Sequence, residues 1–208
     1  MNSITNQIGN SISVIRAFLN LYLTDGTASK EEGMRKIDDV ICTMASINKK
    51  LFTNFDRQML NIGSLIRELS INLADKHGFD TRRISIEAED IEKHVDLVLP
   101  FGVLLTVLIS STMERLKAPD SYIRIVLQNL DSLTEVSLSV NEENFFHGGC
   151  TANEFGNEGE IVKALVEQIG AECKADGRKK NTVIIELASE HGEAADHKNQ
   201  ARHDGPEQ

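Results

Sequence analysis

The sequence predicts an α+β protein in which a helical hairpin precedes a small α/β module. Up to residue 56, apolar residues recur every three or four positions, which is the spacing of amphipathic helices. From residue 57 onward, helical spacing alternates with segments in which every second residue is apolar, the pattern of strands. Large apolar residues almost vanish after residue 188, so burial there cannot offset the entropy lost on ordering. We therefore expect a helical hairpin over 1–56, an α/β module over 57–188 and a flexible tail over 189–208.

The hairpin consists of two predicted amphipathic helices separated by the polar stretch 25–30. The apolar stripe of the first is formed by Ile4, Ile8, Ile12, Ile15, Leu19 and Leu23. The stripe of the second is formed by Met34, Ile37, Ile41, Met44, Ile47 and Leu51. Two such helices cannot cover each other's stripes completely. We therefore expect a second copy of the chain to complete a dimeric four-helix bundle.

The α/β module begins with a third helical pattern that starts near Ile62 and ends at His77. Gly78 stands where a helix C-cap glycine is usual. The remaining predicted elements follow in the order strand, helix, two strands, helix, two strands, at 84–86, 101–116, 122–130, 136–140, 161–169, 172–174 and 183–187. That order indicates an α+β sandwich.

Charge and cysteine content argue against several classes of function. The formal net charge of −10 disfavours nucleic-acid binding, which needs clustered Lys and Arg, and the one compact basic run, 178–180, has the character of a turn. The cysteines, Cys42, Cys150 and Cys173, are an odd number and lack metal-ligand spacing. We expect free thiols and no metal site.

No segment resembles a membrane anchor or a leader. The longest apolar candidate, 97–109, is interrupted by Pro100, Gly102 and Thr106, and the first residues lack a basic region followed by a continuous apolar run. These patterns predict a cytoplasmic protein without membrane contact.

Five short sequence motifs along the chain can be compared with those of a known protein family. They are Asn-Gln-Ile-Gly-Asn-Ser-Ile-Ser-Val-Ile at 6–15, Ile-Asn-Lys-Lys-Leu-Phe at 47–52, Ile-Arg-Glu-Leu at 66–69, Pro-Phe-Gly-Val-Leu-Leu at 100–105 and Gly-Glu-Ile-Val-Lys-Ala-Leu-Val-Glu-Gln-Ile-Gly at 159–170. Together they resemble the core of bacterial two-component histidine kinases, from about Ser3 to Leu187. The resemblance implies a dimerisation and phosphoacceptor hairpin over 1–56, followed by an ATPase-like α/β domain over 57–188.

The phosphoacceptor position departs from this family. The string at 6–15 lies over a His-Arg-Val-Lys-Asn-Asn-Leu-Gln motif and places Asn6 where the family has its histidine. Phosphotransfer needs an imidazole nitrogen that forms a labile phosphoramidate. The nitrogen lone pair of an asparagine amide is delocalised into the carbonyl, so Asn6 offers hydrogen bonds only.

The implied nucleotide site departs as well. Where the family has a glutamate and a Mg²⁺-binding asparagine, this sequence has Val107 and Ser111. The adenine-reading Asp-x-Gly-x-Gly loop corresponds to 142–146, with Glu142 at its start and Asn144 and Phe146 in place of the glycines. Loss of a metal ligand weakens Mg²⁺ binding, and loss of the glycines hinders close approach of the nucleotide. We expect ATP and Mg²⁺ binding to be lost and no cofactor to be required.

Six histidines remain as alternative acceptors. His77 lies at a predicted helix end, where its ring can cap carbonyls, and His94 lies in a polar connection. The others, in the loop before residue 150 and in the tail, are His147, His191, His197 and His203. None has the regular spacing of a metal site, and we expect each to be an exposed histidine.

The first helix carries a second prediction. Asn6, Asn10, Ser13 and Val14 follow one another along one side and form either a docking face for a receiver domain, as the resemblance implies, or a plain solvated surface. We expect a catalytically inactive, homodimeric histidine-kinase-like or phosphotransferase-like protein that binds a response regulator receiver domain or a histidine kinase. The alternatives are an active phosphotransferase or weak kinase that uses a non-standard histidine, and a structural dimer without a signalling partner.

Overall fold

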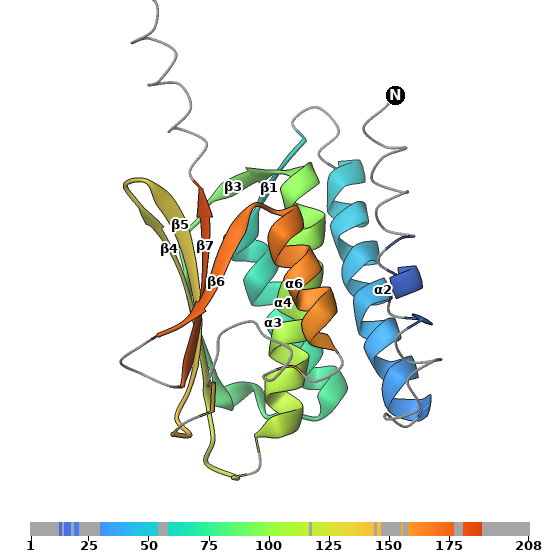
Figure 1. The fold of residues 1–208 in the computed structure, drawn as a ribbon, viewed down its shortest axis with the longest axis vertical. Helices are drawn as coiled ribbons and strands as arrows, with labels where there is room; N and C mark the ends of the chain where they lie inside the picture. Colours follow the sequence, from blue (N-terminus) through green and yellow to red (C-terminus); the bar gives the residue numbers. More distant parts are fainter. Residues whose placement is uncertain are drawn as a thin grey trace, which may run out of the picture.

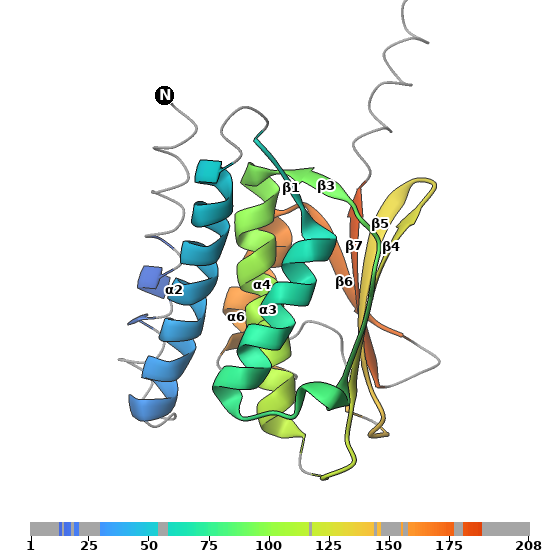
Figure 2. The same cartoon turned by 180° about the vertical axis from the view of Figure 1, so that it is seen from behind.

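The computed structural model describes residues 13, 15–17, 19–20, 30–53, 58–116, 118–143, 145–146, 155, 158–176 and 181–188. Its helices are α2 (Lys30–Thr53), α3 (Ile62–His77), the 3₁₀ helix η1 (Thr81–Arg83), α4 (Val95–Arg115) and α6 (Gly159–Gln168). Its strands are β1 (Met59–Asn61), β2 (Ile84–Ala88), β3 (Glu92–His94), β4 (Ile123–Leu130), β5 (Leu133–Val140), β6 (Ala171–Ala175) and β7 (Thr182–Ala188). Figures 1 and 2 show three layers: a sheet, the helices α3, α4 and α6 against one of its faces, and α2 outside them.

The main sheet is mixed and has five strands in the order β2-β4-β5-β7-β6. β2 runs parallel to β4, and the other pairs are antiparallel. Along β5, buried and half-buried residues alternate, as expected for a strand with one face on the core. This sheet and its helical layer confirm the predicted α+β class. A second sheet pairs β1 with β3; sequence analysis missed it because strands of three residues are too short to show a period of two.

Helix α4 is the central element of the fold. It is buried almost without interruption from Val98 to Met113, because the sheet lies on one side and α2 on the other. A helix that is apolar on all sides is stable in water only when other elements cover it on all sides. The helix continues through Pro100, Gly102 and Thr106, which we had expected to interrupt the apolar run. Its length and composition would suit a membrane span, but 89% of its most apolar window is buried inside the fold.

Helix α3 begins and ends with clear capping interactions. At its start, the side chain of Asn61 accepts a hydrogen bond from the backbone N–H of Ser64 at 2.8 Å. At its end, Gly78 has φ 64°, in the left-handed region, and its N–H bonds to the carbonyls of Ala74 and Asp75. The predicted C-cap role of Gly78 is confirmed.

Helix α2 packs across α4 in an antiparallel direction. Ile47 lies over Gly102, where an added Cβ would be 2.6 Å from its Cδ1 atom. One turn earlier along α2, the hydroxyls of Thr43 and Thr106 are hydrogen-bonded at 2.7 Å. The absence of a side chain at Gly102 therefore lets the two helices approach closely.

The buried face of α2 differs in part from its predicted apolar stripe. Met44 and Ile47 are buried, but Met34 is 72% exposed and Ile41 is 43% exposed. Val40, Met44 and Ile47 belong to one apolar cluster with residues of α3, α4 and the sheet. The core therefore continues across the domain boundary predicted at residue 56, while the dimeric bundle stays a prediction.

Two of the cysteines have described states. Cys42 is free and exposed on α2, as predicted. Cys173, on β6, is disulfide-bonded, so the prediction of a free thiol there is wrong. Spacing along the sequence carries no information about which cysteines approach each other in space.

Candidate functional site

The position implied for metal binding, Ser111, lies at the centre of a buried ionic contact between three helices. Its hydroxyl donates to Oε2 of Glu158, the residue that precedes α6, at 2.5 Å. The ammonium group of Lys36, from α2, donates to Oγ of Ser111 at 2.9 Å and lies 3.1 Å from Oε1 of Glu158. All three residues are at most 5% exposed. An ammonium ion and a carboxylate of the chain itself therefore hold the hydroxyl of Ser111.

The same ammonium group joins a wider set of charges. Nζ of Lys36 is 2.9 Å from Oε2 of Glu114 on α4, and the guanidinium of Arg35 is 3.0 Å from Oε1 of Glu114. Nδ1 of His77 lies 3.7 Å from the same Oε1 atom. We call the residues Lys36, Ser111, Glu114 and Glu158 the ionic latch, since Lys36 connects α2 to both α4 and the start of α6.

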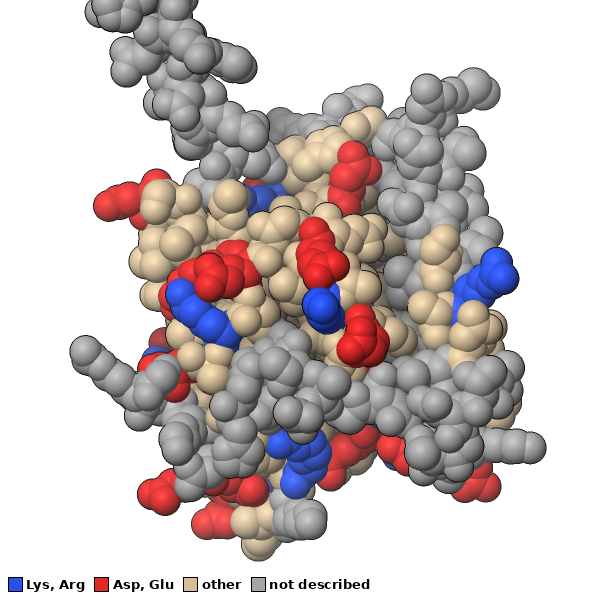
Figure 3. All heavy atoms as spheres, in the orientation of Figure 1, with Lys and Arg blue, Asp and Glu red and all other residues tan. Residues whose placement is uncertain are grey.

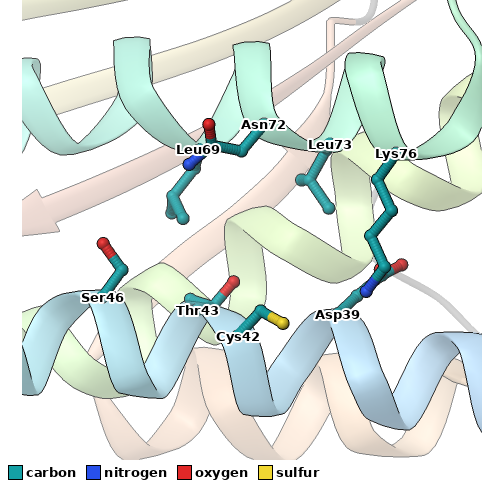
Figure 4. Close-up of a pocket in the computed structure, with 8 residues that line it drawn as sticks. All are labelled: Asp39, Cys42, Thr43, Ser46, Leu69, Asn72, Leu73 and Lys76. Carbon is teal, nitrogen blue, oxygen red and sulfur yellow. The ribbon is translucent and has the colours of Figure 1, made fainter.

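A second ionic contact joins α2 to α3. Figure 4 shows the side chain of Lys76 extending from α3 toward Asp39 on α2, and the two charged groups are 2.7 Å apart. The other carboxylate oxygen of Asp39 is 2.7 Å from Nε2 of His77. Burial by itself raises the pKa of Asp39, but the contacts with His77 and Lys76 outweigh it and lower that pKa below its usual 3.8. Asp39 is therefore held as a carboxylate.

This lowered pKa predicts an acid-dependent stability. A carboxyl group with a depressed pKa in the folded state stabilises the protein above its unfolded-state pKa, and that contribution is lost as the pH falls through the folded-state value. We expect the free energy of unfolding of the wild type to fall between pH 5 and pH 3 by on the order of 1 kcal/mol more than that of Asp39→Asn. Urea unfolding at several pH values measures this. Asp38→Asn is the control, because the Asp38 side chain is 60% exposed. Equal pH slopes for the wild type and Asp39→Asn would contradict the assignment.

The other positions of the implied nucleotide site are also engaged by the fold. Val107 is 2% exposed in the apolar core, and the carboxylate of Glu142 accepts a hydrogen bond from the hydroxyl of Ser121. Phe146, at a glycine position of the family motif, is fully buried. Asn144 lies outside the described residues.

Phe146 is the centre of an aromatic cluster at the end of α4. Its ring packs edge-on against Phe145 with centroids 4.8 Å apart, and against Phe155 at 6.3 Å. The guanidinium of Arg115 lies 4.2 Å from the ring centroid of Phe145 and donates to its backbone oxygen at 2.7 Å. The described part of the adenine-loop segment is therefore packed as core by its own side chains.

Two histidines can be placed. The prediction that His77 is exposed and caps carbonyls is wrong: its side chain is 4% exposed and binds Asp39, because α2 covers the end of α3. His94 is half-exposed and is the N-cap of α4, where Nδ1 accepts from the N–H of Asp96 at 3.4 Å and Nε2 lies 3.1 Å from Oε1 of Gln58. The remaining four lie outside the described residues. Within the part of the chain that is described, no group of three or more His, Cys, Asp or Glu could hold a metal ion.

The predicted docking face on the first helix lies mostly outside the described residues. Ser13 is described and exposed, while Asn6, Asn10 and Val14 are not described. On the face shown in Figure 3, the visible Lys and Arg side chains lie apart from one another among acidic ones, so the coloured part of this face has no continuous basic patch.

Sequence reasoning did not identify the ionic latch or the Asp39 contact. The sequence offers one indication of them: the polar residues Lys36, Asp39 and Thr43 of α2 lie on the same buried helix face as the apolar Val40 and Ile47. Charged residues on a helix are usually solvated, so spacing alone does not distinguish buried polar residues from exposed ones.

Comparison with known proteins identifies the fold. No protein-family model matches the sequence, and no curated protein matches it. The histidine kinase domain of the blue-light activated histidine kinase of Erythrobacter litoralis is similar with a TM-score of 0.60 at 10% identity, over 86% of this chain and 94% of that one. Another structure of that kinase gives a TM-score of 0.66 at 10% identity, over 91% of this chain and 61% of that one. The chain therefore has the fold of a histidine kinase core, as the sequence resemblance implied.

Proposed function

We propose that this chain is a catalytically inactive, histidine-kinase-like protein that dimerises and binds a two-component signalling partner, a receiver domain or a histidine kinase, to modulate its signalling. The kinase-type fold supports a place in two-component signalling. Three replacements support inactivity, because they affect separate parts of the reaction: the acceptor at Asn6, the metal ligand at Ser111 and the adenine loop at Phe146.

The observation that carries the proposal is the contact of Ser111 with Lys36 and Glu158. A Mg²⁺ ion coordinated by this hydroxyl would meet an ammonium group 2.9 Å from the same oxygen atom. The nearby carboxylate of Glu158, which could attract the ion, already has the Lys36 ammonium and the Ser111 hydroxyl as partners. The residues present therefore do not fit a Mg²⁺–ATP complex, and we derive no catalytic step through one.

Dimerisation is supported by the outward face of α2. Met34 and Ile41 are exposed there, although both belong to the predicted apolar stripe, and a second copy of the hairpin would bury them. We place the protein in the cytoplasm, where receiver domains and kinase cores act. The disulfide at Cys173 disfavours a reducing compartment.

Partner binding is tested by titrating the purified full-length chain with receiver domains and histidine kinases encoded near its gene. We expect one of them to bind with a Kd in the micromolar range, about 8 kcal/mol. Asn10→Arg with Ser13→Arg on the predicted docking face should weaken that binding about tenfold or more. Exposed Tyr122→Arg, which lies on the α/β module, serves as the matched control. Absence of binding to every candidate, or equal binding by the docking-face and control variants, would refute this role.

The enzymatic alternative is a phosphotransferase that uses a non-standard histidine. Burial of His77 against Asp39 disfavours that residue, which leaves His94 and the histidines outside the described residues. Incubation with a phosphorylated receiver distinguishes the two functions. If this chain acquires an acid-labile phosphate, and a His94→Asn variant or a variant without the loop and tail histidines does not, the chain is an active phosphotransferase.

A further inference from the structure

We infer that the edge of the main sheet at β2, together with the groove between β2 and α3, is an interface for a second copy of this chain. β2 is the last strand at one end of the sheet, and β4 pairs with only one of its two edges. Figure 2 shows β2, the green strand that follows η1, running beside α3. This surface is separate from the outward face of α2, so the inference stands whether or not the proposed function is right.

The backbone of β2 presents hydrogen-bonding groups at its outer edge. The N–H of Glu89 donates to the oxygen of Leu127 on β4. Successive residues of a strand direct their backbone groups to opposite edges. The N–H and oxygen of Ile84, Ile86 and Ala88 therefore face away from β4.

Two of these groups already have partners within the chain. The N–H of Ile84 donates to the oxygen of Thr81, and the oxygen of Ala88 accepts from the guanidinium of Arg67. No described residue bonds to the oxygen of Ile84, to the N–H or oxygen of Ile86, or to the N–H of Ala88. Free groups in a row along a sheet edge pair readily with another strand.

A second β2 strand matches this pattern when the two strands run antiparallel about a two-fold axis at Ile86. Ile86 then lies opposite the partner's Ile86, and Ile84 lies opposite the partner's Ala88. The two groups that have partners of their own, the Ile84 N–H and the Ala88 oxygen, face each other in this register. Every free group of one strand faces a complementary free group of the other.

The side chains of this edge are compatible with the same register. Ile84 and Ile86 are half-buried on the face that packs against the core, and they line a groove with Ile71 of α3, which is 46% exposed. A second copy would cover these apolar side chains with its own, and cross-strand pairs of β-branched residues stabilise a sheet. On the other face, Glu87 lies opposite the partner's Ser85, so like charges do not meet.

The charges at the two ends of the groove favour a second copy over another partner. Arg67 lies at the Ala88 end, and Asp75, two turns further along α3, lies at the end formed by Thr81 and Ile84. The Arg67 side chain is 43% exposed, and Asp75 is exposed without an ion pair among the described residues. Rotation about the two-fold axis brings Arg67 of each copy toward the partner's Asp75. An apolar centre between exchanged opposite charges is complementary to itself.

Concentration-dependent hydrogen exchange of the full-length chain, measured by mass spectrometry, tests this interface. Because β2 is short, we expect a weak dimer with a Kd on the order of 10–100 μM. The amides of Ile86 and Ala88 should exchange about threefold or more slowly at about 300 μM than at about 1 μM. The amides of β6, at the opposite edge of the sheet, should exchange equally at both concentrations. A dimer formed through the hairpin alone would leave β2 unprotected.

Reversal of the charges identifies the register. Asp75→Arg and Arg67→Glu, each alone, place like charges opposite each other twice in the symmetric dimer, and we expect each to abolish the concentration dependence at β2. In an equimolar mixture of the two variants, the heterodimer has opposite charges at both ends, so protection should return to within about twofold of the wild type. Glu172→Arg makes the same charge change on an exposed residue of β6 and serves as the matched control, with wild-type behaviour expected.

Three results would overturn the inference. The first is exchange of β2 in the wild type that does not depend on concentration. The second is an Asp75→Arg protein that is protected like the wild type, and this comparison holds even if Arg67→Glu folds poorly. The third is a mixture of two folded variants that stays as unprotected as each variant alone, because the two charges would then not face each other.

Discussion

Phe146→Gly, which restores the glycine of the resembled kinase motif, will lower the free energy of unfolding by about 3–5 kcal/mol and will not create an ATP site. The fully buried ring contacts Phe145 and Phe155, so its removal leaves a cavity in the aromatic cluster. Urea denaturation measures the loss of stability, and calorimetric titration with Mg²⁺–ATP measures binding.

Tyr122→Ala provides the control for loss of an aromatic ring. Tyr122 is 48% exposed, so its removal should change the free energy of unfolding by no more than about 0.5 kcal/mol. A Phe146→Gly protein that is as stable as the wild type and binds ATP would show that the ring merely blocks an otherwise intact nucleotide site.

Ile47→Ala will lower the free energy of unfolding by about 2–5 kcal/mol. Ile47 is fully buried although it belongs to the hairpin, because it packs over Gly102 of α4. Met34→Ala on the same helix should change stability by no more than about 0.5 kcal/mol, since Met34 is 72% exposed. Chemical denaturation of the two variants provides the measurement.

The comparison of these two variants decides whether α2 shares the core of the α/β module. A single unfolding transition that shifts in Ile47→Ala is expected, because one apolar cluster contains residues of α2, α3, α4 and the sheet. If Ile47→Ala leaves the α/β module unaffected and only a separate hairpin transition shifts, α2 forms an independent unit.

Much of the fold could be predicted where hydrophobic periodicity was strong. The end of α3 at His77 and the C-cap at Gly78 were correct, because glycine after a helical stripe has one common conformational role. Strands over 122–130 and 136–140 were also predicted and correspond to β4 and β5, since apolar and polar residues alternate there. The start of α4 at Val95, before Pro100, was not predicted, because a proline beyond the first turn removes a backbone donor and usually kinks or ends a helix.

The candidate site was only partly predictable. Motif comparison identified Ser111 and Phe146 as altered positions, but it could not show what the new side chains contact. Lys36 and Ser111 are 75 positions apart in the chain, and Asp39 and His77 are 38 positions apart. Such pairings follow from how α2 docks on α3 and α4, and a pattern read along one segment contains no information about that docking.

Incubation of the full-length chain with labelled ATP and Mg²⁺, followed by detection of phosphohistidine under neutral conditions, tests the central claim of catalytic inactivity most directly. We expect no acid-labile label on the chain, because Asn6 cannot accept the phosphoryl group and Ser111 is held by Lys36 and Glu158. A stoichiometric, acid-labile label that maps to any histidine would show an active kinase and contradict this account.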